Sequence, residues 1–315
     1  MSHAPQLSIL DYATVIPHMR WSDAVAAIRA GHLLPRAEMR DVFLGPADGT
    51  MMSRSAFIDG LGYGAKSFTV FDANAARGLP TVQGSMLVFD KDTGSLSSII
   101  DSAVVTEIKT AADSVLGASL LARPDSRHLL VVGAGTVAAS MVRAYTAVLP
   151  GIDRISVWAR RPQQAVQLAD TLSDVTVRMD AVTDLEKAVG DADIITSATM
   201  ARAPVILGDW VKPGTHVDLI GAYKADMREA DDALMARAAL FVDSRASTIG
   251  HIGELMMPIS AGAITAESVL GDLYDLVQPG ARRRQSAEEI TVFKNGGGAH
   301  LDLMVATYIA QVMRG

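Results

Sequence analysis

Three small residues, Gly133, Gly135 and Ala138, stand at the spacing of a turn that can hold phosphate groups. They follow the apolar run "HLLVV" and open a segment with helical spacing. In such a turn the first glycine permits a sharp bend and the second lets a pyrophosphate approach the backbone, while the small third residue lets the helix pack closely on the strand. The position of the motif between a strand and a helix predicts a dinucleotide-binding site rather than an ordinary tight turn.

Two arginines end the next expected strand, at the place where NAD-binding folds put an acid for the ribose hydroxyl. This strand ends Trp158-Ala159-Arg160-Arg161, with no Asp or Glu at its tip. Guanidinium groups can hold a 2′-phosphate through charge-assisted hydrogen bonds, or stack on adenine. The alternative is a pair of solvated arginines before a helix. The sequence favours NADP(H), bound in part by Ala159, Arg160 and Arg161, and leaves NAD(H) possible.

Lys66 is one of few charged residues in the alternating apolar stretch "AKSFTVF". A buried lysine is costly unless it is paired, and burial lowers its pKa toward values that are useful in proton transfer. The alternative places Lys66 on the solvated face of the strand. The residues alone leave both interpretations open.

The elements that would position these residues follow two patterns. From Ser126 onward, apolar runs of four to eight residues alternate with helical segments, which indicates a parallel sheet covered on both faces. The preceding part is α+β, with a helix over "WSDAVAAIRAGHL", alternating strands and a long helix over 103–122. The tail "ITVFKNGGGAHLDLMVATYIAQVMRG" starts as a strand and ends as an amphipathic helix.

The composition excludes several classes of protein. With 315 residues, 49% hydrophobic and 20% charged, the chain is too apolar to be disordered. A net charge of -7 favours neither nucleic acid nor an anionic membrane as partner. Cysteine is absent and the seven histidines are scattered, so we expect no disulfide and no metal site. No signal peptide or long apolar run is evident, and the cytoplasm is the expected location.

The sequence resembles the ornithine cyclodeaminase and mu-crystallin family from about residue 35 to its end. The likeness rests on segments in the family's order: "GYGAKSFTVFDANAARGLPTVQGSMLVFDKDTGSLSSIID", "VVTEIKTAADS", "VVGAGTVAA", "ADIITSAT", "DWVKPGTHVDLIGAYKADMREADDALM" and "ITVFKNGGGAHLD". The segment "WVKPGTHVDLIGA" is particularly similar to the ketimine reductase, or mu-crystallin, branch.

This resemblance implies a homodimer with two domains in each chain. Residues 1–122 and 292–315 would form an α+β substrate-binding and dimerisation domain, and residues 123–291 a Rossmann domain with a doubly wound parallel sheet. It also implies a small-molecule substrate held by its α-carboxylate near the nicotinamide.

The resemblance assigns roles to individual residues by position. Lys66 corresponds to the lysine that contacts the substrate and handles a proton. Arg40 takes roughly the place of a substrate-binding arginine, although Arg36 is close enough to leave that alignment open. Cofactor-lining positions fall on Thr81, Thr136, Val137, Thr199 and Ile220, and the junction of substrate and nicotinamide falls on Asn295 and Gly296.

Two departures from the family pattern bear on the reaction. Lys109 stands where the family has an arginine that grips the substrate carboxylate, so the bidentate fork is lost unless Arg40 or Arg54 supplies it. Tyr223 follows Gly221 and Ala222 at the turn where cyclodeaminases carry an aspartate. Losing a positioned base typically costs about 10²–10⁴-fold in rate, so the sequence argues against a cyclodeaminase.

The sequence therefore predicts an NADPH-dependent reductase of the C=N bond in a small carboxylate-bearing imine, such as pyrroline- or piperideine-2-carboxylate. Lys109 and Arg40 would bind the carboxylate, with Arg54 as the alternative source of the guanidinium fork. Lys66 would hydrogen-bond or protonate near the imine nitrogen, and Tyr223 would shape the pocket, hydrogen-bond the substrate or only pack. The alternatives are an ornithine cyclodeaminase, an amino-acid dehydrogenase, and a non-catalytic protein that binds a ligand together with NADPH.

Overall fold

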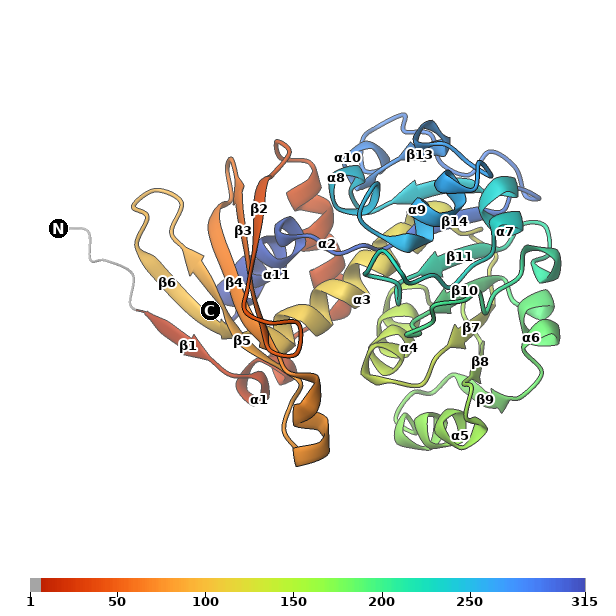
Figure 1. Cartoon of the computed structure of the whole chain (residues 1–315), viewed down its shortest axis with the longest axis horizontal. Coiled ribbons are helices and arrows are strands. Elements are labelled where there is room, and N and C mark those ends of the chain that lie inside the picture. Colours follow the sequence, from red (N-terminus) through yellow and green to blue (C-terminus); the bar gives the residue numbers. More distant parts are fainter. Residues whose placement is uncertain (1–6, 315) are drawn as a thin grey trace. The chain divides into compact units, whose positions relative to one another are not determined.

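The computed structural model describes residues 7–314, which form two compact units (Figure 1). Unit 1 contains the residues up to Lys109 and those from Gly298 onward, and unit 2 is Thr110–Gly297. The predicted boundaries were at residues 122 and 292. In the structure the first boundary falls inside helix α3 (Ser102–Leu121), and the second follows strand β14 (Thr291–Lys294).

Unit 1 is a six-stranded sheet with helices packed on it. The strands follow the order β1-β6-β5-β4-β3-β2, with β1 parallel to β6 and the other pairs antiparallel. Its elements are β1 (Ser8–Leu10), α1 (Tyr12–Val15), α2 (Trp21–His32), β2 (Glu38–Leu44), β3 (Thr50–Ile58), β4 (Gly62–Val70), β5 (Val82–Phe89), β6 (Leu96–Asp101), the first part of α3, and α11 (Ala299–Val312).

Helix α11 packs against β2, β3, β4, β5 and α2, so it covers one face of this sheet. Gly64 on β4 allows the close approach, because a Cβ there would lie 2.9 Å from Cδ1 of Leu303. Most of α11 is apolar and buried, and each large apolar side chain removed from water stabilises the fold by about 2 kcal/mol. The opposite face of the sheet leaves Val42, Leu44 and Tyr63 about half exposed.

Unit 2 contains an eight-stranded, entirely parallel sheet in the order β13-β12-β14-β11-β10-β7-β8-β9. Helices lie on both sides of it, with α4 on one side and α6 and α7 on the other (Figure 1). The elements not yet given are β7 (His128–Val132), α4 (Thr136–Val148), β8 (Arg154–Trp158), α5 (Pro162–Thr171), β9 (Arg178–Val182), α6 (Leu185–Asp191), β10 (Ile194–Ser197), β11 (His216–Leu219), α7 (Asp232–Arg237), β12 (Ala239–Val242), α8 (Arg245–Thr248), α9 (Gly253–Ser260), β13 (Val269–Gly271) and α10 (Leu273–Leu276).

The order β9-β8-β7-β10-β11 is the reversal that defines a doubly wound nucleotide-binding fold. The predicted fold class, a Rossmann domain joined to an α+β domain, is confirmed. Strand β7 is the first strand of this unit and has β8 on one side and β10 on the other, so a crevice is expected beyond the carboxyl ends of β7 and β10.

The structure differs from the sequence analysis at three strands. Strand β3 was not identified as a strand, because "TMMSRSAFI" mixes apolar, polar and charged side chains. Strand β9 begins at Arg178, three residues after Val175, where the alternating stretch "VTVRM" of the sequence begins. The tail strand β14 belongs to unit 2, because it pairs with β11 and β12.

Within residues 7–314, no helix combines the length and the apolar character required to cross a bilayer.

Candidate active site

The glycine turn lies at the carboxyl end of β7, where the order of the sheet reverses. Gly133 has a φ of +121°, and a Cβ at this position would lie 2.6 Å from the carbonyl oxygen of Ala198, which follows β10. Both the backbone conformation and the close approach therefore require glycine. The bend directs the chain out of β7 and into α4 at the expected crevice.

Residues Gly135–Val137 present exposed backbone at the start of α4. A Cβ on Gly135 would meet no atom within 4 Å, so the space beside this residue is open. No side chain caps the helix and its first turn carries no acid, which leaves the N-terminal N–H groups available to an anion. Ala138 is fully buried, as expected for the residue that packs the helix on the strand.

Arg160 and Arg161 follow β8 and are exposed, while Ala159 is buried beside them. The Arg161 side chain donates from Nε to Oε1 of Gln164 at 3.0 Å, and Pro162 begins α5. Both arginines therefore follow the carboxyl end of β8, the strand next to the one that ends in the glycine turn. The position suits recognition of a phosphate on the adenosine ribose.

A buried carboxylate that the sequence analysis did not identify, Glu229, joins the loops after β10 and β11. Its Oε1 accepts hydrogen bonds from Ser197 Oγ and from both the amide and the hydroxyl of Thr199, each at 2.7 Å. Its Oε2 accepts the amide of Gly221 at 2.5 Å. Glu229 therefore fixes the loops that contain the predicted cofactor-lining residues Thr199 and Ile220.

A second buried acid, Glu254 on α9, supports Glu229. Its two carboxylate oxygens accept the amides of Glu229 and Ala230 at 2.7 and 2.9 Å. Burial raises the pKa of Glu254 to about 7, the charge of Glu229 acts in the same direction, and Lys294 opposes both. Glu254 is therefore close to its titration point at neutral pH.

The glycine-rich loop after β14 is fixed by Asp243, which lies directly after β12. Asp243 Oδ2 accepts the amides of Gly296 and Gly297 at 3.0 and 2.6 Å. The preceding Asn295 is buried, and its Nδ2 donates to Thr110 O and Ser114 Oγ, both at 3.0 Å. The predicted positions Asn295 and Gly296 are thus held rigidly at the carboxyl edge of the sheet in unit 2.

Lys66 lies on the covered face of the sheet in unit 1, with 4% of its surface exposed. Its Nζ forms a salt bridge with Asp302 Oδ1 on α11 at 2.6 Å and donates to Thr106 Oγ1 on α3 at 3.2 Å. Of the two interpretations of Lys66, the structure supports the buried, paired lysine.

The charges around Lys66 set the protonation of this pair. Burial lowers the pKa of Lys66 to about 8; the Asp302 carboxylate opposes that shift, whereas the Lys109 and Arg54 charges add to it. For Asp302, burial alone favours a higher pKa, but the charges of Lys66, Lys109 and Arg54 bring it below its ordinary value. At neutral pH the pair is an ammonium and a carboxylate.

Arg54 and Lys109 complete a positively charged cluster with Lys66. Arg54 on β3 lies directly opposite Lys66 on β4, so both side chains project from the same face. The Arg54 guanidinium binds Asp41 with Nη2 2.9 Å from Oδ2. Lys109 on α3 is buried, and in residues 7–314 no salt bridge joins it to a carboxylate. Lys109 is therefore a buried cation suited to an external anion.

Some predicted site residues belong neither to the crevice of unit 2 nor to the charged cluster of unit 1. Arg40 pairs with Ser55 on β3, so it projects from the face opposite to Arg54 and Lys66, and it is exposed. Thr81 belongs to unit 1, between the short helical segment Asp72–Arg77 and β5, whereas the other predicted cofactor positions belong to unit 2. Tyr223 is half exposed after the Gly221 turn, with Lys224 Nζ 5.4 Å from its ring centre.

Asp302 was also missed, although the sequence contains a signal for it. It is a single acid in the apolar helix "AHLDLMVATYIAQV", and 11 of the 14 residues of α11 are buried. A charge on the buried face of a helix requires a partner of opposite charge. From the sequence, this rule predicts a buried basic partner for Asp302, and Lys66 is a candidate.

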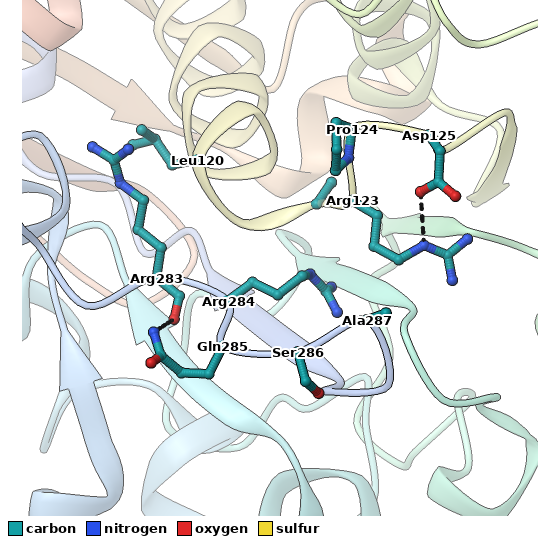
Figure 2. A pocket seen from close by; sticks show the side chains of 10 residues that line it. Leu120, Arg123, Pro124, Asp125, Arg283, Arg284, Gln285, Ser286 and Ala287 are labelled. Atoms are coloured by element: carbon teal, nitrogen blue, oxygen red, sulfur yellow. Dashed lines mark hydrogen bonds and ion pairs between the residues drawn. The ribbon is translucent and has the colours of Figure 1, made fainter.

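Unit 2 also has a hollow of about 660 Å³, at the edge of the sheet away from the glycine turn. Figure 2 shows arginines from two segments lining it, with Arg123 bound to Asp125. Arg283 donates to the carbonyl of Leu276, and Arg284 donates to the carbonyls of Leu121 and Glu289. These guanidinium groups connect main-chain segments, so the basic stretch "ARRRQS" (281–286) has a structural role here.

In the described residues, no three His, Cys, Asp or Glu side chains are arranged to hold a metal ion.

The fold and the turn after β7 define a nucleotide-binding protein of the Rossmann type. A family model for the ornithine cyclodeaminase/mu-crystallin family matches residues 47–315. The chain belongs to this family, and the resemblance noted in the sequence is confirmed.

Curated relatives and solved structures show which members of the family this chain is similar to. Delta(1)-pyrroline-2-carboxylate reductase of Paracoccus denitrificans (strain Pd 1222) is 76% identical over 314 residues, which cover 100% of this chain and 99% of the relative. Ketimine reductase mu-crystallin of Mus musculus is 35% identical, with 83% of this chain and 79% of the relative covered. The structure of the iminosuccinate reductase of Paracoccus denitrificans in complex with NAD+ matches with a TM-score of 0.91 and 27% identity, covering 98% of this chain and 96% of that one.

Proposed function

We propose that this protein is an NAD(P)H-dependent reductase of the C=N bond in a small carboxylate-bearing imine, with Δ1-pyrroline-2-carboxylate as the first candidate. The observation that carries the proposal is the 76% identity, over the whole chain, with a reductase of that name. Hydride from the nicotinamide adds to the imine carbon and a proton adds to the nitrogen, so that the imine becomes a secondary amine and NAD(P)H becomes NAD(P)+.

The charged cluster of unit 1 supplies the groups that this substrate requires. Lys109 is a buried ammonium without a salt bridge in residues 7–314, and it is our candidate for binding the substrate carboxylate. Arg54 shares the face of Lys66, whereas Arg40 does not, but Nε and Nη2 of Arg54 bind Asp41; Arg54 is therefore a candidate for adding positive charge beside the substrate rather than for supplying the missing fork. Lys66, which is protonated at neutral pH, acts at the imine nitrogen.

The charge balance of the cluster favours a substrate with one carboxylate. Lys66 is paired with Asp302 and Arg54 with Asp41, which leaves the charge of Lys109 for the substrate. One carboxylate neutralises that charge. A second carboxylate would require breaking one of the two pairs, of which Lys66–Asp302 is buried and costly to separate, whereas Arg54–Asp41 is partly exposed.

We further propose that the cofactor binds at the turn of Gly133 and Gly135, in unit 2, and that NADP(H) is preferred. The uncapped start of α4 supports a bound pyrophosphate, and the exposed Arg160 and Arg161 support a bound 2′-phosphate. Thr199 and Ile220, Asn295 and Gly296 would line the nicotinamide end. Thr81 and Tyr223 stay candidates for the cofactor and the substrate, respectively.

Assembly as a homodimer is part of the proposal. Val42, Leu44, Met51 and Tyr63 are exposed and project from the face of the unit 1 sheet that α11 does not cover. Apolar side chains grouped on a sheet face mark an interaction surface. Light scattering after gel filtration should give a molar mass of twice the 33.3 kDa of one chain.

The direct test is oxidation of NADPH followed at 340 nm with cyclic ketimine carboxylates, with NADH compared separately. Oxidation that depends on the imine supports the reductase. Release of ammonia from ornithine without net cofactor change would instead favour a cyclodeaminase, and oxidation that requires ammonia and a 2-oxo acid would favour a dehydrogenase. If the protein only binds NADPH, the variant Lys109→Arg restores the arginine of the family pattern. Activity in this variant would mean that the substitution at residue 109 had altered a catalytic site, and no activity would favour a binding protein.

A further inference from the structure

The Lys66 ammonium is held at two of its three donor positions. One N–H binds Asp302 Oδ1 at 2.6 Å, and another binds Thr106 Oγ1 at 3.2 Å. A lysine ammonium has three N–H groups, so one remains for a further acceptor. Because Asp302 comes from α11 and Thr106 from α3, two separate helices fix the direction of the remaining N–H.

The elements around Lys66 contribute charges of both signs. Helix α11 contributes Asp302 and the buried His300, whose pKa burial lowers well below its usual value. Helix α3 contributes Lys109, and β3 contributes Arg54, which in turn binds Asp41 on β2. In the described part of the chain, Asp302 is the one carboxylate within salt-bridge distance of Lys66. Burial and the two neighbouring cations favour loss of the Lys66 proton, and Asp302 opposes that loss.

We propose that Asp302 is a positioning residue of the reductase: it keeps Lys66 as an ammonium and directs the remaining N–H at the imine nitrogen. This inference rests on the proposed function. A bound NAD(P)H would supply the hydride to the imine carbon; at Lys66 an N–H bond breaks as the new N–H bond of the amine forms. Lys66 then recovers a proton from solvent, while Asp302 stays ionised throughout.

The second oxygen of Asp302 is consistent with this role. Asp302 Oδ2 is buried and accepts no hydrogen bond in residues 7–314. Among the described residues, Lys66 is therefore the hydrogen-bond donor on which the ionised Asp302 depends, and the two groups stabilise each other's charged forms.

The first measurement is the pH profile of kcat/KM for imine reduction in wild type, Asp302→Asn and Asp302→Glu. Lys66 acts as an acid, so the rate should fall as the pH rises through its pKa of about 8. Without the Asp302 charge the lysine loses its proton more easily, so in Asp302→Asn the basic limb should move down by at least about one pH unit. Asp302→Glu keeps the charge and should keep the limb near the wild-type position even where kcat falls.

A second measurement does not depend on turnover. The pH titration of the Lys66 Cε signal, by NMR of protein carrying ¹³C-labelled lysine and bound NADP+, reports the same proton directly. The signal is assigned by its loss in Lys66→Arg. Its midpoint should move down in Asp302→Asn and stay in place in Glu107→Gln, a control that removes a carboxylate of the same unit, bound to Tyr12.

The outcomes separate this inference from the proposed function. A uniform loss of rate in Asp302→Asn, with an unmoved pH limb and an unmoved NMR midpoint, would mean that Asp302 only supports the fold and would overturn the inference. Absence of imine-dependent oxidation in wild type would overturn the proposed function, and the inference would fail with it. If the basic limb of the pH profile and the NMR midpoint of Lys66 both move down in Asp302→Asn, the result supports both the inference and the proposed function.

Discussion

The two groups of candidate residues are stabilised by different kinds of interaction. The crevice of unit 2 is built from backbone: glycines form the turns, and Glu229 and Asp243 hold the loops through main-chain amides. The cluster of unit 1 is built from side-chain charges, with the Lys66–Asp302 pair between a sheet and a helix. Under the proposed function, backbone geometry would bind the cofactor, whereas a local balance of side-chain charges would bind the substrate.

This difference predicts how each region responds to substitution. A substitution in the crevice of unit 2 should lower cofactor affinity only in part, because several backbone amides would contribute to binding. A change in the charged cluster should remove one function outright, because Lys66 has one carboxylate partner within salt-bridge distance in the described residues, and Lys109 has none there.

Lys66→Gln should have the largest effect. Removal of the ammonium takes away the proton donor, and turnover should fall by about 10²–10⁴-fold. NADPH affinity, measured by fluorescence titration, should stay within about threefold of wild type because the proposed cofactor site belongs to unit 2. The exposed Lys91→Gln is the control. Loss of NADPH binding together with turnover would mean that the two regions do not act separately.

Replacement of Arg160 and Arg161 by serine should come next. If these side chains bind the 2′-phosphate, the ratio of kcat/KM for NADPH to that for NADH should fall by about 10–100-fold. Arg154→Ser, at the other end of β8, should leave the ratio unchanged. An unchanged ratio in the double variant would contradict the NADP(H) preference but not the location of the crevice.

Glu229→Gln should weaken the crevice more moderately. The carboxylate accepts four hydrogen bonds, and an amide nitrogen at either position would face a donor instead. The Kd for NADPH should rise by about tenfold, while the pH profile assigned to Lys66 stays in place. Glu186→Gln, in the first turn of α6, is the matched control. Wild-type affinity in Glu229→Gln would show that loop positions in the crevice do not depend on this residue.

Glu254 should give the smallest effect, visible in stability rather than in rate. Its pKa is about 7 in the folded protein and near 4.5 when exposed, so the folded state holds its proton more tightly. The free energy of unfolding should therefore decrease as the pH rises from about 4.5 to 7, by on the order of 1–3 kcal/mol from this group. Glu254→Gln should flatten that slope in urea titrations. An unchanged slope would mean that other groups dominate.

The sequence was most informative where the functional residues are close together along the chain. Gly133, Gly135 and Ala138 lie within six residues, so their spacing alone predicted the turn that the structure shows. The alternation of strands and helices predicted the parallel sheet for the same local reason. The burial of Lys66 was one of two interpretations, because alternation in a strand does not say which face is covered.

The partners of the functional residues were beyond that kind of analysis. Asp302 is 236 residues from Lys66, and Glu229 is 30 residues from Thr199. Such pairs form only when distant elements pack. Arg40 and Arg54 illustrate the same limit: β3 was not recognised, so the pairing that puts Arg54 opposite Lys66, and Arg40 on the other face, had no basis in the sequence.

Helix α11 has a consequence for the order of events during synthesis. It follows unit 2 in the chain, yet it covers the sheet of residues that are translated first. Until the ribosome has released α11, Lys66 lacks its carboxylate partner and the apolar face of that sheet lacks its cover. A chain that stops before residue 299 is therefore expected to bind chaperones or aggregate rather than to act as a partial enzyme.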